Sequence, residues 1–545
     1  MNRNLLNAIG KIDPRYIEEA ACVQNQTEGT TEFTERDPER NNGSRAVVLR
    51  ERRGSVWALA AAALFLVAAL GTAWLILSQR NPGGTDPSII QADTPGGSED
   101  TMKAVPPETS DRTAPSEDPE YNKLNLDFDA MLEAADSDAL RSVCEYIQNQ
   151  TPSRKNEMTG LFAGKNLILI TAQNFSPYVI DPERTPTLYR LATQGIEFTD
   201  YYQPAWGGAA HTGEFSILTG LVPADGTQSI KETIGKDMRF TLGNQLQNRG
   251  YFSRAWCNQF TYDYADRNQT HENLGYKKFI GIGNGLEERL TRQWPYSDRE
   301  MIDATITEYL DRQPFSVYYM TCSGIGIYKT MGNKMAEIHW DEVEDLPYSD
   351  TVKGYIAANM EVEYALRDLV AALEDAGIAD ETVIVLSSSE YPYALEKDED
   401  YGNFEDYLGE LYGKPVENCF ERDHSALIIW SGCLEGKHYK VTTPTSSLDI
   451  LPTLSNLFGL EYDSRLFVGR DVFSDQEPLV FWPDGSWKTD KYSYNQDTRV
   501  YSSADGTDIT YDYAMEHHHA VEDKISFSKT VLETDLYALL RFSEE

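Results

Sequence analysis

The chain has 545 residues, of which 41% are hydrophobic and 11% aromatic, so it can bury a large core. Its 48 Lys and Arg residues against 87 Asp and Glu residues give a formal net charge of −39. So acidic a surface repels nucleic acid and anionic lipid headgroups, which excludes a nucleic-acid role and suits solubility outside a cell.

The N-terminal part predicts a membrane anchor. Residues 1–54 are polar and charged after a short amphipathic opening, which predicts a mostly disordered segment. The run 55–78, SVWALAAAALFLVAALGTAWLILS, has no charged residue and is about long enough to cross a bilayer as one helix. Trp57 and Trp74 lie near its two ends, where indoles favour the interface. A cleaved signal peptide fits less well, because the run is too long and starts too far into the chain.

Charges beside this run predict its orientation. Arg50, Arg52 and Arg53 precede it and only Arg80 closely follows it, which puts residues 1–54 in the cytoplasm and the rest outside the plasma membrane. Residues 79–120 are rich in Pro, Gly, Ser, Thr and Asp and predict a flexible extracellular stalk. With Cys22 inside, five of the six cysteines lie outside, and their spacing does not choose a disulfide.

From Tyr121 the pattern becomes globular, with buried strands alternating with helices. Strands are predicted at 166–170, 314–321, 382–388 and 426–430. Helices are predicted within 124–148, at 185–195, from a capping box at Ser297 and Glu300, around 366–373 and at 447–459. This alternation predicts an α/β fold, an α/β/α sandwich with a mostly parallel sheet, whose ligand sites lie at the carboxyl ends of the strands.

The segments at those strand ends carry a resemblance to a known family. In order and spacing, NLILITAQNFSPYVI, TPTLYRL, GIEFTDYY, GEFSILTGL, YYMTCSG, TVIVL and SSLDILPTLSNLFGL with DSRLFVGRDVFS resemble the lipoteichoic acid synthase branch of the sulfatase and alkaline phosphatase superfamily. The resemblance covers 121–545. It implies a phosphoglycerol transferase or a phosphate or sulfate ester hydrolase, with one divalent metal, usually manganese, held by a Glu, a nucleophilic Thr and an Asp-His pair.

The chain departs from that pattern at the positions that carry the chemistry. The ligand Glu falls on Gln173, the nucleophile on Ala210, and the Asp-His pair on Ser389 and Glu390. Ala210 has no side-chain oxygen, and Gln is a poor ligand for a hard cation. The His of the family's T-x-S-G-H string falls on Ile325, while Glu214 is retained. The resemblance therefore implies a retained fold, lapsed chemistry and no bound cofactor.

Three neighbouring residues leave alternatives open. Thr212 could replace the nucleophile, but it lies two residues further along, about 200° round a helix of ~3.6 residues per turn, and a capping role competes. His211 could bind phosphate or simply be exposed. Glu390 could hold a loose, calcium-like ion with Gln173 and Ser389, or be a solvated glutamate.

Two further motifs invite a metal interpretation. Asp423 and His424 repeat the Asp-His pair, but they precede the 426–430 strand, which predicts that they lie at the wrong end of a strand. His517, His518 and His519 are adjacent on a predicted helix and point in different directions, so a solvated helix face is favoured.

The sequence thus predicts a membrane-anchored, extracytoplasmic and catalytically inactive protein that binds, scaffolds or regulates at the cell envelope. Its ligand would be a glycerophosphate polymer, an anionic lipid headgroup or a protein partner. The alternative is an active phosphoglycerol transferase or ester hydrolase with non-standard ligands and manganese or another divalent cation. A third reading makes residues 1–54 the functional end and the outer domain a sensor.

Overall fold

A computed structural model describes residues 120–207, 210–224, 228–328, 332–397 and 405–543. The predicted cytoplasmic segment, the predicted membrane helix and residues 79–119 of the predicted stalk lie outside these ranges. Among the helices within them, none is long and apolar enough to cross a membrane.

The described region is built on an eight-stranded sheet with the strand order β5-β4-β6-β1-β7-β8-β2-β9. All neighbouring strands run parallel except β8, which is antiparallel to both β7 and β2. The sheet is therefore mostly parallel, as predicted. Its strands are β1 (Asn166–Ala172), β2 (Ile196–Phe198), β4 (Phe252–Cys257), β5 (Phe279–Gly281), β6 (Phe315–Thr321), β7 (Thr382–Ser388), β8 (Leu427–Trp430) and β9 (Tyr439–Val441).

Both faces of this sheet are buried. In β1, Leu167 and Leu169 belong to one hydrophobic core and Ile168 and Ile170 to the other, because successive side chains point to opposite faces. The first core includes α7 (Ala210–Thr219), α9 (Leu242–Asn248) and α16 (Ile450–Leu457), and the second includes α6 (Pro186–Gln194), α11 (Asp298–Thr305) and α13 (Asp350–Asp375). The predicted α/β/α sandwich is confirmed.

The N-terminal cap that the sequence predicts for α11 is present in the structure. Ser297 Oγ accepts a hydrogen bond from the backbone N–H of Glu300 (3.0 Å), as the predicted cap requires. The Glu300 carboxylate instead accepts from the N–H of Thr291 (2.7 Å), so only half of the predicted capping box forms. The predicted 447–459 helix is divided into a 3₁₀ turn, η8 (Ser447–Asp449), followed by α16.

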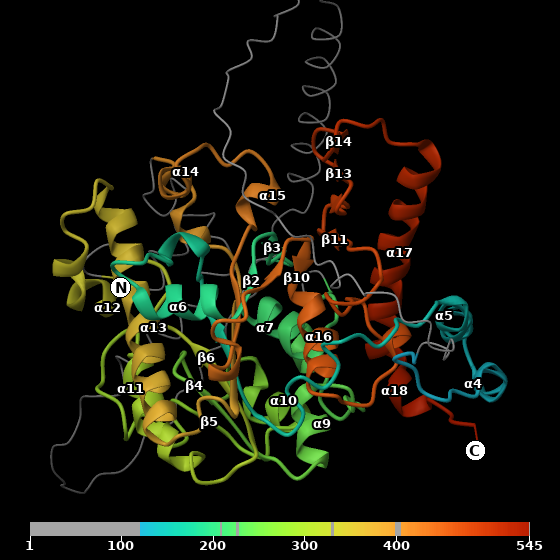
Figure 1. Cartoon of the computed structure of the whole chain (residues 1–545), viewed down its shortest axis with the longest axis horizontal. Coiled ribbons are helices and arrows are strands. Elements are labelled where there is room, and N and C mark those ends of the chain that lie inside the picture. Colours follow the sequence, from blue (N-terminus) through green and yellow to red (C-terminus); the bar gives the residue numbers. More distant parts are fainter. Residues whose placement is uncertain (1–119, 208–209, 225–227, 329–331, 398–404, 544–545) are drawn as a thin grey trace, which may run out of the picture. The chain divides into compact units, whose positions relative to one another are not determined.

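A second, antiparallel sheet of four strands, β11-β12-β13-β14, packs with the long helix α17 near the C-terminus (Figure 1). The sequence patterns did not predict it. Its strands are β11 (Val480–Phe481), β12 (Trp487–Lys488), β13 (Tyr492–Asn495) and β14 (Val500–Ser503), and α17 covers Tyr511–Thr534. The shorter elements are α4 (Phe128–Ala134), α5 (Asp138–Asn149), β3 (Tyr201–Tyr202), α8 (Ser229–Glu232), α10 (Arg267–Asn273), α12 (Lys334–Ile338), α14 (Tyr407–Tyr412), α15 (Cys419–Arg422), β10 (Thr445–Ser446) and α18 (Leu536–Leu539).

This second sheet corrects the prediction for the histidine run. His517 is buried and stacks on Tyr513 with ring centroids 4.0 Å apart, and its Nδ1 lies 2.8 Å from the Tyr513 carbonyl oxygen. His518 packs against Tyr494 and lies 2.8 Å from the Tyr501 hydroxyl. The aromatic side chains of the sheet, and not solvent, therefore surround two of the three histidines. The five cysteines of the described region are all free thiols.

Candidate functional site

The carboxyl edge of the sheet brings β1, β7 and α7 together. The backbone N–H of Ser389, just after β7, donates to the carbonyl oxygen of Ala172, the last residue of β1 (3.0 Å). Helix α7 lies directly on this junction, because a Cβ at Gly213 would stand only 1.6 Å from the Ser389 carbonyl oxygen. Glycine is required there for the close approach. The segments carrying Gln173, Ala210 and Ser389 are therefore neighbours.

The loop after β6 closes against the same edge. A Cβ at Gly324 would come within 2.1 Å of the Gln173 carbonyl oxygen, so this loop also approaches at van der Waals distance. Ile325 follows and is buried with Phe260 and Cys322 in a small apolar cluster. An aliphatic side chain in an apolar cluster cannot bind anionic oxygens, so the position matching the family's His contributes only packing.

Two predictions about exposure are wrong. His211 is buried, with 6% of its surface exposed, where exposure was the favoured alternative. Burial, reinforced by the Arg267 guanidinium, lowers the pKa of His211 to about 4, so the imidazole is neutral at neutral pH. Glu390 is 2% exposed and is not a solvated glutamate. Thr212 is also buried, two residues into α7.

Buried polar atoms remain at this edge. Within the described residues, Nε2 of Gln173, Nδ1 of His211 and Oγ of Ser389 have no hydrogen-bond partner. None of the three groups carries a negative charge. Such groups suit water or a neutral ligand better than a divalent cation.

The retained Glu214 forms an ion pair that the sequence did not predict. Its Oε2 lies 2.8 Å from Nη2 of Arg267, and its Oε1 lies 3.2 Å from Nε2 of His271 and accepts from the Tyr318 hydroxyl (3.0 Å). All four side chains are fully buried. Burial alone would raise the pKa of Glu214, but Arg267 and His271 outweigh it and hold this pKa at about 2. A signal for this pair exists in the sequence, since Arg267 and His271 are four residues apart on α10 and share one helix face.

This ion pair is connected to Gln173, the residue predicted to match the family's ligand Glu. Arg267 Nη1 donates to Oε1 of Gln259 (2.9 Å), and Gln259 Nε2 donates to Oε1 of Gln173 (2.9 Å). The side-chain oxygen of Gln173 is therefore already occupied by a protein donor. A buried guanidinium lies two hydrogen bonds away from it.

A second polar network anchors the loop that carries Ile325. Asp298, at the start of α11, accepts hydrogen bonds from the backbone N–H groups of Cys322 (2.9 Å) and Ser323 (3.3 Å). Asn333 Nδ2 donates to the carbonyl oxygens of Ser323 (2.8 Å) and Ile325 (2.9 Å). Burial raises the pKa of Asp298 to about 6. The side chains of Asp298 and Asn333 thus hold the geometry of this loop.

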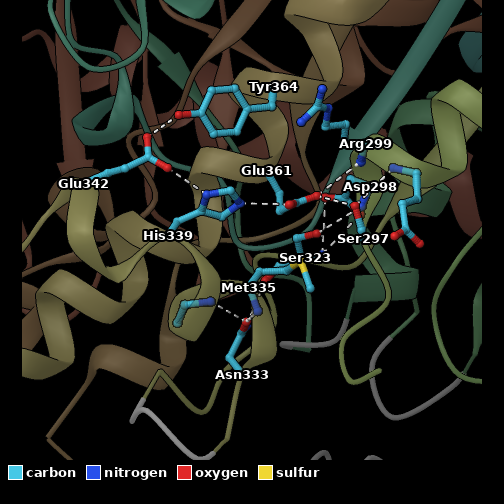
Figure 2. Close-up of polar contacts among 12 residues, drawn as sticks. Ser297, Asp298, Arg299, Ser323, Asn333, Met335, His339, Glu342, Glu361 and Tyr364 are labelled. Carbon is cyan, nitrogen blue, oxygen red and sulfur yellow. Dashed lines mark hydrogen bonds and ion pairs between the residues drawn. The ribbon is translucent and has the colours of Figure 1, made fainter. Parts of the chain in front are cut away.

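Figure 2 shows how this network continues outward through α13. Ser297 Oγ donates to Oε2 of Glu361 (2.6 Å), and Nε2 of His339 lies 2.8 Å from Oε1 of the same carboxylate. Nδ1 of His339 lies 2.8 Å from Oε1 of Glu342, and the other carboxylate oxygen of Glu342, Oε2, accepts a hydrogen bond from the Tyr364 hydroxyl. Burial disfavours the charged imidazole, but the hydrogen bonds to Glu361 and Glu342 outweigh it and raise the pKa of His339.

The predicted place of Asp423 and His424 is wrong. Because β8 runs antiparallel to β7, pairing Leu427 with Ser387, the start of β8 lies at the same edge as the carboxyl ends of the parallel strands. Asp423 is nevertheless a structural residue, since it accepts from the backbone N–H of Ala205 (3.1 Å) and from Trp482 Nε1 (3.0 Å). Burial raises its pKa. The ring of His424 packs edge-on against Tyr202.

A cleft of about 790 Å³ adjoins these residues. Ala205, Arg422 and Trp482, which all contact Asp423, form part of its wall. Its other charged residues are mainly acidic: Glu396, Asp406, Glu417, Asp484 and Asp497 against Lys397. The volume lies within the range that small ligands occupy in proteins, roughly 300–1,000 Å³.

The divalent metal that the family pattern implies does not fit these residues. Gln173 offers an amide oxygen that is already bonded, Ala210 offers nothing, and Ser389 offers a neutral hydroxyl. Glu390 would be the one anionic ligand. Across the described part of the chain, no three His, Cys, Asp or Glu side chains are grouped so that they could hold a metal ion. A hard divalent cation needs several carboxylate or carbonyl oxygens.

A mostly parallel sheet between two helical layers, with its candidate site at the carboxyl edge, is an architecture that alkaline phosphatase-like proteins share with other α/β classes. The Sulfatase family profile matches residues 166–460, more than half of the chain, and the chain belongs to this family. Within the alkaline phosphatase superfamily it is lipoteichoic acid synthase-like.

Individual relatives agree with this assignment. The chain is 22% identical over 420 residues to the lipoteichoic acid synthase-like protein YvgJ of Bacillus subtilis, covering 75% of this chain and 66% of the relative. It is 24% identical over 427 residues to the lipoteichoic acid synthase of Staphylococcus saprophyticus, covering 75% and 62%. The chain thus spans less than two thirds of the length of these relatives.

Solved structures show the same fold. The lipoteichoic acid synthase LtaP of Listeria monocytogenes superposes with a TM-score of 0.57 at 17% identity, covering 72% of this chain and 98% of that one. An alkaline phosphatase superfamily protein of Vibrio parahaemolyticus superposes with a TM-score of 0.51 at 14% identity, covering 77% and 100%.

Proposed function

We propose that this protein is a catalytically inactive lipoteichoic acid synthase-like protein, anchored in the plasma membrane by residues 55–78, that binds a component of the cell envelope outside the cell. One observation carries the proposal. The positions matching the nucleophile and metal ligands lie on neighbouring segments of one sheet edge, and they hold Ala210, Gln173, Ser389 and Glu390. The scaffold around them is intact, with its loops anchored by hydrogen bonds, so the fold has been kept without the groups that perform transfer.

Restoring the family residues tests the loss of chemistry. We expect the purified full chain in detergent to hold no stoichiometric manganese and to turn over no phosphodiester. The variant Q173E/A210T/S389D/E390H should bind about one manganese ion per chain, measured by elemental analysis after dialysis. A210T alone adds one hydroxyl and no carboxylate, and serves as the matched control that stays metal-free. Stoichiometric manganese and phosphodiester turnover in the unmodified chain would establish the enzyme alternative instead.

Membrane anchoring needs its own measurement. Cell fractionation should place the chain in the membrane fraction, and protease added to intact protoplasts should digest the domain after Arg80 while sparing residues 1–54. Deletion of residues 55–78 should release the chain. Recovery of the unmodified chain in the soluble fraction would refute the anchor.

The acidic cleft indicates the kind of partner. Its carboxylates would repel a glycerophosphate polymer and attract a basic protein segment, because charge complementarity across an interface suppresses wrong partners. We expect a lysine-rich peptide to bind more tightly than lipoteichoic acid. Asp484→Lys and Asp497→Lys should weaken peptide binding more than Asp508→Lys, a charge reversal at an exposed residue outside the cleft. Tighter binding of lipoteichoic acid, or equal effects of all three reversals, would contradict this choice of partner.

A further inference from the structure

A small cavity with three basic side chains in its wall shares no lining residue with the edge described above. It has a volume of about 90 Å³ and is enclosed between α5, the segment 464–470 and helix α17. Three cationic side chains line it: Arg465, Arg470 and Lys524. Two carboxylates, Asp449 and Glu477, line it as well, so its wall carries one more cation than anion in a chain with a net charge of −39.

The two carboxylates in its wall are already engaged. Oδ1 of Asp449 accepts from the backbone N–H of Arg470 (2.8 Å), and Oδ2 accepts from the N–H of Ser446 (2.8 Å). Oε1 of Glu477 accepts from Lys491 Nζ (2.6 Å) and from the Tyr513 hydroxyl (2.9 Å). Asp449 also favours the charged forms of Lys524 and Arg470 through space, although within the described residues it forms an ion pair with neither.

The cations retain donor capacity. Arg465 pairs with Asp463 at 2.6 Å, but within the described ranges neither Arg470 nor Lys524 forms an ion pair. Arg470 is 7% exposed; its Nη1 donates to the carbonyl oxygens of Asp471 (3.3 Å) and Val472 (3.1 Å) and its Nη2 to Oγ1 of Thr443 (3.0 Å). Its Nε has no hydrogen-bond partner in this part of the chain. The Lys524 ammonium donates to the Val468 carbonyl oxygen, which uses one of its three protons.

Buried donors without acceptors are costly, and a buried cation more so. Burial lowers the pKa of both Lys524 and Arg470, because desolvation disfavours their charged forms. An anion in the cavity would accept the remaining N–H groups and offset both charges. The cavity is well below the roughly 300 Å³ at which pockets for larger organic ligands begin, so it suits a single small group.

We propose that this cavity is a binding site for a small oxyanion, a phosphate ion or the phosphate end of a phosphate ester, held by Arg470 and Lys524. The site shares no lining residue with the sheet edge that carries Gln173 and Ser389, and it does not depend on the proposed function. It gives an acidic protein one place where a phosphate group is attracted.

Calorimetric titration of the full chain in detergent tests the proposal, with inorganic phosphate as the probe and ionic strength held constant with chloride. We expect saturable binding of about one phosphate per chain. Lys524→Gln should weaken it at least about tenfold, since it removes a charge-assisted hydrogen bond. Lys524→Arg should restore binding to within about threefold. Lys529→Gln, on the same helix with a side chain 66% exposed, is the matched control and should leave binding unchanged.

A second measurement, on the unmodified chain, tests phosphate binding without a variant that could fail to fold. Phosphate should raise the thermal unfolding midpoint of the unmodified chain, while chloride at equal ionic strength should not. Titration with glycerol phosphate distinguishes the sources: binding of the ester points to an envelope polymer, and binding of free phosphate alone points to the ion. Absence of saturable phosphate binding, or equal weakening by Lys524→Gln and Lys529→Gln, would overturn the proposal.

Discussion

Replacing Glu214 by Gln should destabilise the protein strongly, because it leaves the Arg267 guanidinium buried without a counter-ion. Removing one partner of a buried ion pair costs about 3–5 kcal/mol. The pKa of Glu214 gives an independent value, since its fall from 4.5 to about 2 corresponds to about 3 kcal/mol. For a folded region of roughly 420 residues, an unfolding entropy of about 2.1 cal/mol/K per residue converts this to a fall of about 3–6 °C in the unfolding midpoint.

The assay is thermal unfolding of the full chain in detergent, followed by tryptophan fluorescence. Glu533→Gln is the matched control, since this glutamate is exposed and pairs with Lys529 at 3.6 Å, so its loss should cost under about 1 kcal/mol. The double variant Glu214→Gln/Arg267→Met removes both charges and should recover part of the loss.

Acid provides a second check. A depressed carboxyl pKa stabilises the folded state above the ordinary value of 4.5, and this contribution is lost as pH falls towards about 2. The difference between the unmodified chain and Glu214→Gln should therefore shrink below pH 4.5. If Glu214→Gln lowers the midpoint no more than Glu533→Gln, or if the double variant costs the full sum of the two single variants, the ion pair does not have the role assigned to it.

Three further substitutions test other contacts in the same assay. Gly213→Ala should lower the unfolding midpoint by at least about 3 °C, because its Cβ would stand 1.6 Å from the Ser389 carbonyl oxygen; a change under 1 °C would contradict the close approach. His339→Gln should lower the stability of the protein below pH 6.5, where the raised pKa of His339 keeps the imidazole that bonds Glu361 charged. This loss of stability should become smaller as pH rises above 6.5. A loss that does not depend on pH would refute the charged hydrogen bond. Asp423→Ala should cost about 1–3 kcal/mol, because Trp482 Nε1 and the Arg422 guanidinium would lose a buried acceptor, and a neutral effect would show that the start of β8 is not held by this side chain.

The sequence alone predicted the elements whose signals are local. Each predicted strand is present, because a short run of apolar, β-branched residues is buried on both faces of a parallel sheet wherever it lies in the chain. The helix starting after Ser297 was likewise fixed by its own cap. The family resemblance, carried by strings beside the strand ends, assigned the chemical positions to Gln173, Ala210, Ser389 and Glu390, and these assignments stay predictions.

The tertiary structure decided everything that depends on how distant segments meet. The direction of β8 follows from the path of the chain before this strand. Because β8 is antiparallel to β7, Asp423 lies at the carboxyl edge of the parallel strands, where the sequence analysis did not expect it. The burial of His211 and Glu390 depends on helices and loops packed over them, which no local pattern encodes. Glu214 and Arg267 are 53 positions apart in the chain, so only the folded core brings them into contact. There each side chain compensates the buried charge of the other.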